Sequence, residues 1–371
     1  MVKYRVVSAD SHVVEPADLW ELRIEPRFRE RAPRVGRVGE REAFVIDGLE
    51  PEFVGALGLF GSAGVPSEKL HEIRQQADGN PGGWDPHVRL KDMSRDGIDA
   101  EILYPSMSMR LYLAEDVEYQ LACFRAYNDW LAELCGTHPK QLFGLGLVSL
   151  ADVESAVGEL ERMKKRGLRG ACISVDLMGG DGSFWDEKYD PFWAHAADLE
   201  LPISLHSLTG GERHDSPGGR IAQVSTQPVF VQRSIANLIE FGVLDRFPGL
   251  HIVSAENDVG WAATYLARMD DAYQRGLRYS GRGGSLSMLP SEYFHRQVYL
   301  TFMYDKPGVE VRHYIGVDNM LWSSDYPHGQ STWPESQRYI EWQFGDLPEE
   351  ERRKIICDNV LKLYGITGYT A

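Results

Sequence analysis

The chain has 371 residues, 43% of them hydrophobic, and a formal net charge of −16, a composition typical of a soluble globular protein with one large domain or two ordinary ones. The acidic balance disfavours nucleic acid and anionic membrane surfaces as partners and favours small molecules or other proteins. No apolar run approaches the roughly 20 residues that span a bilayer, and no signal peptide is visible after Lys3 and Arg5. We therefore expect a cytoplasmic protein without a membrane segment.

The first predicted strand carries a pair of polar residues with metal-binding chemistry. It lies in the apolar, β-branched run from Val6 to Pro16, and Asp10 and His12 stand two positions apart within it. Residues i and i+2 of a strand point to the same face, so this carboxylate and this imidazole can converge on one metal ion. An isolated Asp-x-His pair is common in loops, so the interpretation depends on what the rest of the chain contributes.

Two segments interrupt the regular pattern that follows. Residues 17–86 are rich in Pro, Gly and charge and predict an insertion after the first strand, either a lid over a site or a plain surface excursion. Residues 276–296 contain a glycine-rich run and predict a second insertion before the seventh strand.

Outside these insertions, short apolar strands alternate with amphipathic helices. Asp116 to about Thr137, for example, repeats apolar residues at helical spacing, and so does the segment that begins at Val153 and closes at Gly167. The predicted strands lie near Val6, Glu101, Phe143, Gly170, Pro202, His251, Gln297 and Met320. Eight strands, nearly all apolar and followed by a helix, predict a parallel (β/α)8 TIM-type barrel that forms a single domain over residues 1–371. A doubly wound sheet is the alternative, but no G-x-G-x-x-G or G-x-x-x-x-G-K motif supports it.

Ionisable residues close several of these strands, where barrel enzymes place their chemistry. Besides Asp10 and His12, they are His206 after the fifth strand, Glu256 after the sixth and Asp325 after the eighth. Each alone has an ordinary structural explanation, such as a buried histidine or a turn residue. Together they predict one bound divalent cation, for which imidazole and carboxylate ligands favour Zn²⁺, with Mn²⁺ or another transition metal as the alternative. Asp325 is placed to act as a base as well as a ligand.

The motifs that span the chain resemble those of the amidohydrolase superfamily, and more narrowly the amidohydrolase-2 group that includes aminocarboxymuconate semialdehyde decarboxylase. The matching stretches are Asp10-Ser11-His12-Val13-Val14-Glu15-Pro16, Tyr104-Pro105, Gly167-Leu168-Arg169-Gly170, Pro202-Ile203-Ser204-Leu205-His206, Ser323-Ser324-Asp325-Tyr326-Pro327 and Asp358-Asn359-Val360-Leu361-Lys362-Leu363-Tyr364-Gly365. The resemblance implies a metal-dependent barrel that forms a homodimer, with Asp10, His12, His206 and Asp325 as ligands of one divalent metal.

One residue departs from the pattern of the decarboxylases in this group. They carry a proton-transferring histidine at the end of the sixth strand, whereas this chain has Glu256 there. The departure favours a hydrolase that activates water for attack on a carbonyl-type carbon of a small acid or aromatic compound. A non-oxidative decarboxylase of an aromatic or unsaturated acid is the alternative, and a catalytically silent metabolite-binding barrel is a more remote one. In the hydrolase and in the decarboxylase alike, the proton would be delivered by Glu256 or by His328, which stands three residues after Asp325.

Three further residues are candidates for contacts with the small-molecule substrate. Arg213 and His214 follow the fifth strand, and a guanidinium binds a carboxylate in a bidentate manner. Trp261 offers an aromatic wall, although a tryptophan at helical spacing with Tyr265 and Leu266 is more often a core residue.

Overall fold

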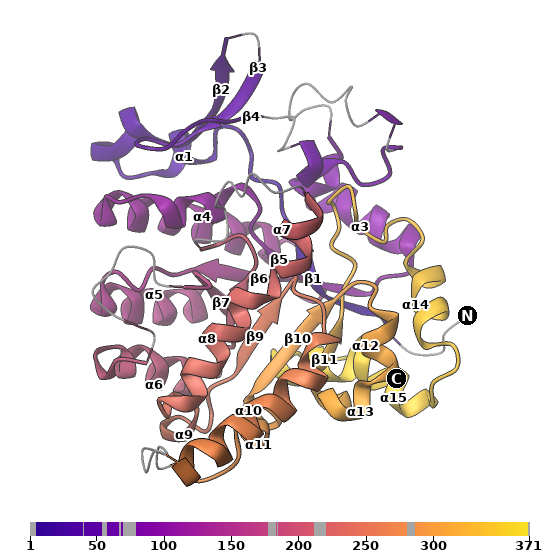
Figure 1. The fold of residues 1–371 in the computed structure, drawn as a ribbon. Helices are drawn as coiled ribbons and strands as arrows, with labels where there is room; N and C mark the ends of the chain where they lie inside the picture. The colour runs from indigo at the N-terminus through magenta and orange to yellow at the C-terminus, as the bar shows by residue number, and fades with distance from the viewer. Residues whose placement is uncertain are drawn as a thin grey trace.

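Eight short parallel strands form the centre of the molecule (Figure 1). The computed structural model describes residues 5–39, 41–53, 58–66, 68–69, 79–176, 183, 185–210, 220–279 and 286–369. Neighbouring strands pair in the order β1, β5, β6, β7, β8, β9, β10 and β11. Their bounds are β1 Val7–His12, β5 Ala100–Tyr104, β6 Leu142–Leu147, β7 Gly170–Ile173, β8 Ile203–His206, β9 Ile252–Ala255, β10 Val298–Phe302 and β11 Met320–Trp322.

The first and last strands meet at their carboxyl ends. The amide of His12 donates to the carbonyl oxygen of Tyr326 at 2.6 Å, and the amide of Asp325 donates to the carbonyl oxygen of Asp10 at 2.9 Å. These two bonds form a seam that brings the sheet close to a complete barrel. The predicted (β/α)8 barrel is thereby confirmed.

Helices cover the outside of the strands (Figure 1). Several of them begin at side chains that accept hydrogen bonds from free amides of the first turn, as Asp116 does from the amide of Tyr119 and Asp152 from that of Ser155. The helices are α1 Leu19–Arg23, α3 Pro86–Asp96, α4 Val117–Gly136, α5 Val153–Lys165, α6 Asp190–Asp198, α7 Arg220–Thr226, α8 Pro228–Glu240, α9 Val243–Arg246, α10 Trp261–Tyr279, α11 Pro290–Gln297, α12 Lys306–Glu310, α13 Arg312–Ile315, α14 Ser336–Phe344, α15 Glu349–Arg353 and α16 Asn359–Leu363. None of the helices in the described ranges is long and apolar enough to cross a membrane.

All eight strands are buried along their whole length, which explains why they read as continuous apolar runs. Two glycines of β6 let the helices approach closely. A Cβ atom at Gly144 would lie 2.7 Å from the side chain of Leu131, and one at Gly146 would lie 2.5 Å from that of Met163. Helices α4 and α5 therefore pack directly onto the backbone of β6.

The segment 17–86 contains a small antiparallel sheet that projects from the barrel (Figure 1). Its strands are β2 Arg34–Val38, β3 Arg41–Val45 and β4 Glu52–Phe53, paired in that order. The segment 276–296 is less irregular than the sequence predicts, because α10 continues to Tyr279 and α11 begins at Pro290. Gly276, a residue that favours the end of a helix, lies inside α10, so the sequence pattern places the end of this helix too early.

Candidate metal centre

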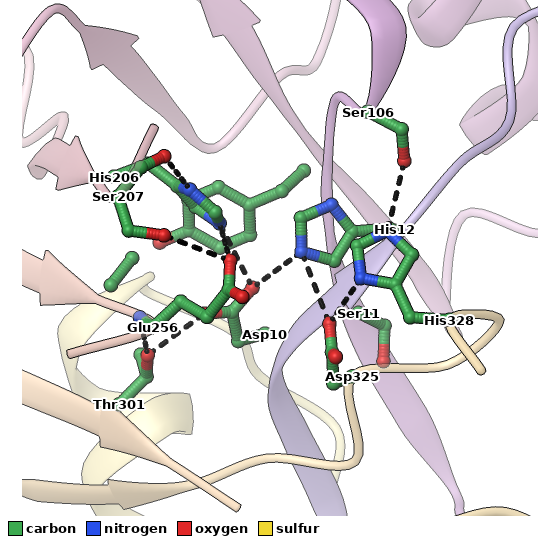
Figure 2. A network of polar contacts seen from close by, with 12 residues as sticks. Asp10, Ser11, His12, Ser106, His206, Ser207, Glu256, Thr301, Asp325 and His328 are labelled. Carbon is green, nitrogen blue, oxygen red and sulfur yellow. Dashed lines mark hydrogen bonds and ion pairs between the residues drawn. The ribbon is translucent and has the colours of Figure 1, made fainter. Parts of the chain in front are cut away.

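The structure brings the four predicted metal ligands together at the carboxyl ends of the strands (Figure 2). Asp10 and His12 belong to β1, His206 is the last residue of β8, and Asp325 follows β11. Nε2 of His12 lies 3.3 Å from Oδ1 of Asp10 and 3.4 Å from Oδ1 of Asp325, and Nε2 of His206 lies 3.8 Å from Oδ1 of Asp10. Ligands about 2.1 Å from a shared metal stand roughly 3.0–3.4 Å apart, so the two separations of His12 fit a common cation, and that of His206 exceeds this range by about 0.4 Å.

Hydrogen bonds of the strands hold both imidazoles in one tautomer. Nδ1 of His12 lies 2.7 Å from the carbonyl oxygen of Pro105, and Nδ1 of His206 lies 2.8 Å from that of Ser207. A carbonyl only accepts, so each Nδ1 carries the proton and each Nε2 presents its lone pair to the site. This is the arrangement that second-sphere carbonyls impose on metal-binding histidines.

The site atoms are buried without hydrogen-bond partners. Ten buried side-chain nitrogen and oxygen atoms in the described part of the chain lack one, and four of them are Oδ1 of Asp10, Nε2 of His12, Nε2 of His206 and Oδ1 of Asp325. Leaving polar or charged atoms buried without partners costs free energy, commonly about 1–3 kcal/mol for each and more for charged groups. A divalent cation would satisfy all four atoms at once, so these residues fit the predicted metal.

The close approach of like and unlike groups shifts their pKa values. Burial opposes ionisation of Asp10, yet its contacts with His12 and His206 hold the pKa of its carboxyl well below the usual range. Burial tends to lower the pKa of His206, but the carboxylate of Asp10 raises it to about 9. The pKa of Asp325 rises to about 7 through burial and the nearby charge of Asp10. Protons therefore stand in for a cation when none is bound.

His328 lies beside this cluster and forms a second group of ligand atoms with His12 and Asp325. Its Nδ1 lies 2.8 Å from Oδ1 of Asp325, and its ring stacks on that of His12 with centroids 4.1 Å apart. Nε2 of His328 lies 3.2 Å from the hydroxyl of Ser106. Burial lowers the pKa of His328 to about 4, so the ring is neutral near pH 7.

Glu256 borders the opposite side of the cluster. Its Oε2 accepts a hydrogen bond from the hydroxyl of Ser207 at 3.0 Å and lies 3.5 Å from Nε2 of His206. Its amide donates to the hydroxyl of Thr301, which in turn donates to Oδ2 of Asp10 at 2.8 Å. Glu256 and His328 thus stand on two sides of the predicted ligands, as Figure 2 shows.

A cavity of about 680 Å³ opens from the cluster. Its walls combine the predicted ligands with apolar side chains from several elements, and this is the usual form of a small-molecule site. The apolar lining residues are Phe60, Met109, Leu208, Val224, Pro228, Phe302 and Met303, joined by Tyr304 near Asp258. Because Phe60 lines the cavity, the insertion 17–86 contributes to the site.

Of the three residues that the sequence predicts as substrate contacts, the structure describes only Trp261. Arg213 and His214 lie outside the described residues. Trp261 does not line the cavity: its Nε1 donates to the carbonyl oxygens of Asn257 and Asp258, and its ring packs against Tyr265. It supports the loop after β9 from behind.

Sequence reasoning did not single out Ser106, Asn257, Asp258 and Tyr304, although all four line the cavity. For Asn257 and Asp258 a signal was present, since they directly follow Glu256 at a strand end. Ser106 and Tyr304 stand in loops where polar and aromatic residues are common, and no sequence pattern marks them.

The sequence model of the amidohydrolase family (Amidohydro_2) matches residues 12–366. The chain belongs to the amidohydrolase family. This confirms the family indicated by the motifs from Asp10 to Gly365, and it agrees with the expected class of metal-dependent hydrolases and carboxy-lyases.

This amidohydrolase is also similar to curated proteins and to proteins of solved structure. The chain is 25% identical over 335 residues to a gamma-resorcylate decarboxylase of Polaromonas sp., covering 85% of this chain and 97% of that protein. It is 27% identical over 175 residues to 2-amino-3-carboxymuconate-6-semialdehyde decarboxylase of Dictyostelium discoideum, a match that spans 47% of that relative. A crystal structure of an amidohydrolase from Mycobacterium avium subsp. paratuberculosis superposes with a TM-score of 0.82 at 25% identity, covering 98% of this chain and 100% of the other. A 5-carboxyvanillate decarboxylase from Novosphingobium aromaticivorans shares the fold, with a TM-score of 0.72 at 20% identity over 98% and 97% of the two chains.

Proposed function

We propose that this amidohydrolase is a metal-dependent, non-oxidative decarboxylase of an aromatic or unsaturated acid. The observation that carries the proposal is the convergence of four unpartnered ligand atoms, from Asp10, His12, His206 and Asp325, at the floor of an apolar-walled cavity. The named decarboxylases among its relatives support this reaction better than hydrolysis, which Glu256 favours from sequence alone.

The four residues would hold one divalent cation through Oδ1 of the carboxylates and Nε2 of the imidazoles. When bound, such a cation supplies positive charge that attracts a substrate carboxylate and stabilises negative charge on a neighbouring oxygen. Related solved structures contain manganese, which supports Mn²⁺, the alternative from sequence, over Zn²⁺. The homodimer and the cytoplasmic location stay predictions from the sequence.

The residues around the floor of the cavity would deliver one proton to the substrate. His328 lines the cavity between Ser106 and Asp325, in the position to take up a proton and pass it to the substrate carbon that bears the carboxylate. When that carbon gains the proton, its bond to the carboxylate breaks, the bonding electron pair returns to the ring or alkene, and CO2 leaves. Glu256, across the cluster, is the second candidate for this proton.

The apolar walls of the cavity provide the environment in which these steps would take place. Phe60, Met109 and Phe302 line the cavity with apolar surface, and electrostatic interactions are stronger where apolar surface replaces water. The departing CO2 carries no charge, so it lacks the electrostatic attraction that would hold the substrate carboxylate at the floor of the cavity.

The test measures both products of the reaction. The full-length protein, loaded with Mn²⁺, is incubated with mono- and dihydroxybenzoic acids in D2O that contains oxygen-18. We expect one CO2 in the headspace for each acid consumed, and one deuterium at the carbon that loses the carboxylate. Oxygen-18 in the organic product without CO2 release would instead establish hydrolysis, the second candidate, which the carboxylate of Glu256 beside the ligands favours.

A further inference from the structure

The three residues that follow β9 form what we call the acceptor loop: Glu256, Asn257 and Asp258. All three line the cavity. Glu256 and Asp258 have φ angles of 58° and 54°, a left-handed conformation that non-glycine residues rarely adopt. Fixed contacts maintain it, since the Glu256 amide donates to Thr301 and Nε2 of Gln227 donates to the Glu256 carbonyl oxygen at 2.8 Å. The loop is therefore held rigidly against the cavity.

The acceptor loop presents oxygen atoms that receive no hydrogen bond. Asn257 is 3% exposed, and its Nδ2 donates to the carbonyl oxygen of Ala255 at 2.7 Å, which fixes the orientation of the amide. Its Oδ1 is buried and has no partner. Within the described ranges, no residue donates to Oε1 of Glu256 or to the carboxylate of Asp258. Three successive side chains thus offer acceptors to whatever occupies the cavity.

The charged groups around Asp258 are negative. Burial, together with the nearby charges of Asp305 and Glu256, raises the pKa of the Asp258 carboxyl to about 6. Among the described residues that line the cavity there is no lysine or arginine. A hydroxyl or amino group would find acceptors at this wall, whereas a second carboxylate would meet the like charge of Glu256 and Asp258.

We propose that the acceptor loop determines specificity: it selects monocarboxylic acids that carry a hydroxyl or amino donor away from the carboxylate, and it rejects dicarboxylic acids. The inference rests on the proposed function, because it requires the substrate carboxylate to face Asp10, His12, His206 and Asp325. The acceptor loop then contacts the opposite side of the same substrate molecule. A site that must satisfy a buried acceptor, here Oδ1 of Asn257, discriminates strongly against analogues that lack the donor.

The test compares matched acids in equilibrium binding to the Mn²⁺-loaded, full-length protein, with CO2 release followed in parallel. The probes are benzoate and its 3- and 4-substituted hydroxy, methoxy and carboxy derivatives. We expect at least one hydroxy acid to bind tenfold or more tightly than its methoxy counterpart, and each dicarboxylic acid to bind tenfold or more weakly than benzoate. Asp258→Asn keeps the shape of the side chain and removes its charge, and we expect it to reduce at least fivefold the ratio by which a dicarboxylic acid binds more weakly than benzoate.

The matched control is Asp271→Asn, which removes an exposed carboxylate of α10 that pairs with Arg275. It leaves all affinities unchanged. Equal affinities for hydroxy and methoxy acids, or an unchanged dicarboxylate penalty in Asp258→Asn, would overturn the inference while the proposed function stands. Selective binding of hydroxy acids without CO2 release would instead leave the loop's role intact and overturn the proposed function. Failure of every benzoate to bind would overturn both.

Discussion

Two buried polar clusters meet at the end of β1, and they differ in completeness. The complete cluster is built on Arg89 and Glu101, whose Nε and Oε2 lie 2.5 Å apart in a fully buried pair. Arg89 also donates to the carbonyl oxygens of His12, Gly82 and Tyr326, and Glu101 accepts from Ser11. In the incomplete cluster, Asp10, His12, His206 and Asp325 each leave one atom without a partner.

The difference lies in where the positive charge comes from. In the complete cluster the chain supplies its own cation, Arg89, opposite Glu101. In the incomplete cluster, Asp10 and Asp325 face imidazoles that present lone pairs, so the chain supplies acceptors and leaves the cation to come from outside. The buried charge of Glu101 is therefore paired within the chain, whereas the buried carboxylates of Asp10 and Asp325 are left for a bound cation to pair.

The largest effect is expected from breaking the complete cluster. Arg89→Met leaves the carboxylate of Glu101 buried without its partner, and we expect it to lower the free energy of unfolding by about 3–5 kcal/mol. Urea unfolding followed by circular dichroism measures the loss. The double variant Arg89→Met with Glu101→Leu is the matched control, since it removes both charges and should recover a large part of the stability. A loss below about 1 kcal/mol in the single variant would refute the comparison.

Asp96 provides an intermediate case, a buried carboxylate whose partners are neutral. It accepts from the amide and the hydroxyl of Ser336, and burial raises its pKa to about 6. The unfolded chain ionises this group near its ordinary value of 3.8 and the folded chain near 6, so the folded state binds more protons between these values. Its contribution to stability is full below about pH 4 and is lost as the pH rises through 6.

In the unmodified protein, ionisation of Asp96 should lower the free energy of unfolding by an amount on the order of 3 kcal/mol between pH 4 and 7. We therefore expect this fall to be absent in Asp96→Asn. The measurement is denaturant unfolding of both proteins across that range, and only the difference between them is interpreted. Parallel curves for the two proteins would show that Asp96 does not titrate in this window.

Filling the incomplete cluster should stabilise the protein. At a metal concentration 100 times the dissociation constant, Mn²⁺ is expected to raise the unfolding free energy by about 2.7 kcal/mol. His206→Ala and Asp325→Asn should abolish this gain and reduce the metal content of the purified protein. His313→Ala, which removes an exposed imidazole elsewhere, is the control. Full metal content in both ligand variants would show that the ligand assignment is wrong.

The smallest effect concerns the link from the incomplete cluster to His328. Ser106→Ala removes the hydroxyl 3.2 Å from Nε2 of His328, a contact worth about 1 kcal/mol. We expect kcat for CO2 release to fall roughly fivefold, with KM and metal content unchanged. Ser225→Ala on the exposed face of α7 should change none of these. An unaltered kcat in Ser106→Ala would argue against a role for His328 in proton transfer.

The barrel and its four candidate ligands could be predicted because the relevant signals are local. Buried parallel strands read as apolar runs, and the residues that close them, such as His206 and Asp325, stand at fixed offsets from those runs. The order of the strands along the chain then places their carboxyl ends on one face.

The rest depends on contacts between distant segments. Arg89 lies on α3 at a position typical of a solvated helical face, and only the packed structure shows it paired with Glu101. Trp261 has the aromatic character of a substrate contact, but tertiary packing places its ring behind the acceptor loop. No local pattern distinguishes these outcomes, because each is decided by elements far away in sequence.

The seam between β1 and the segment after β11 has a consequence for biosynthesis. Asp10 and Asp325 are separated by most of the chain, and their backbones join only when the last strand docks on the first. A nascent polypeptide that has not yet emerged past Asp325 therefore contains only part of the ligand set. Loading with metal would thus follow completion of the barrel, and partly synthesised or truncated chains would not sequester the ion.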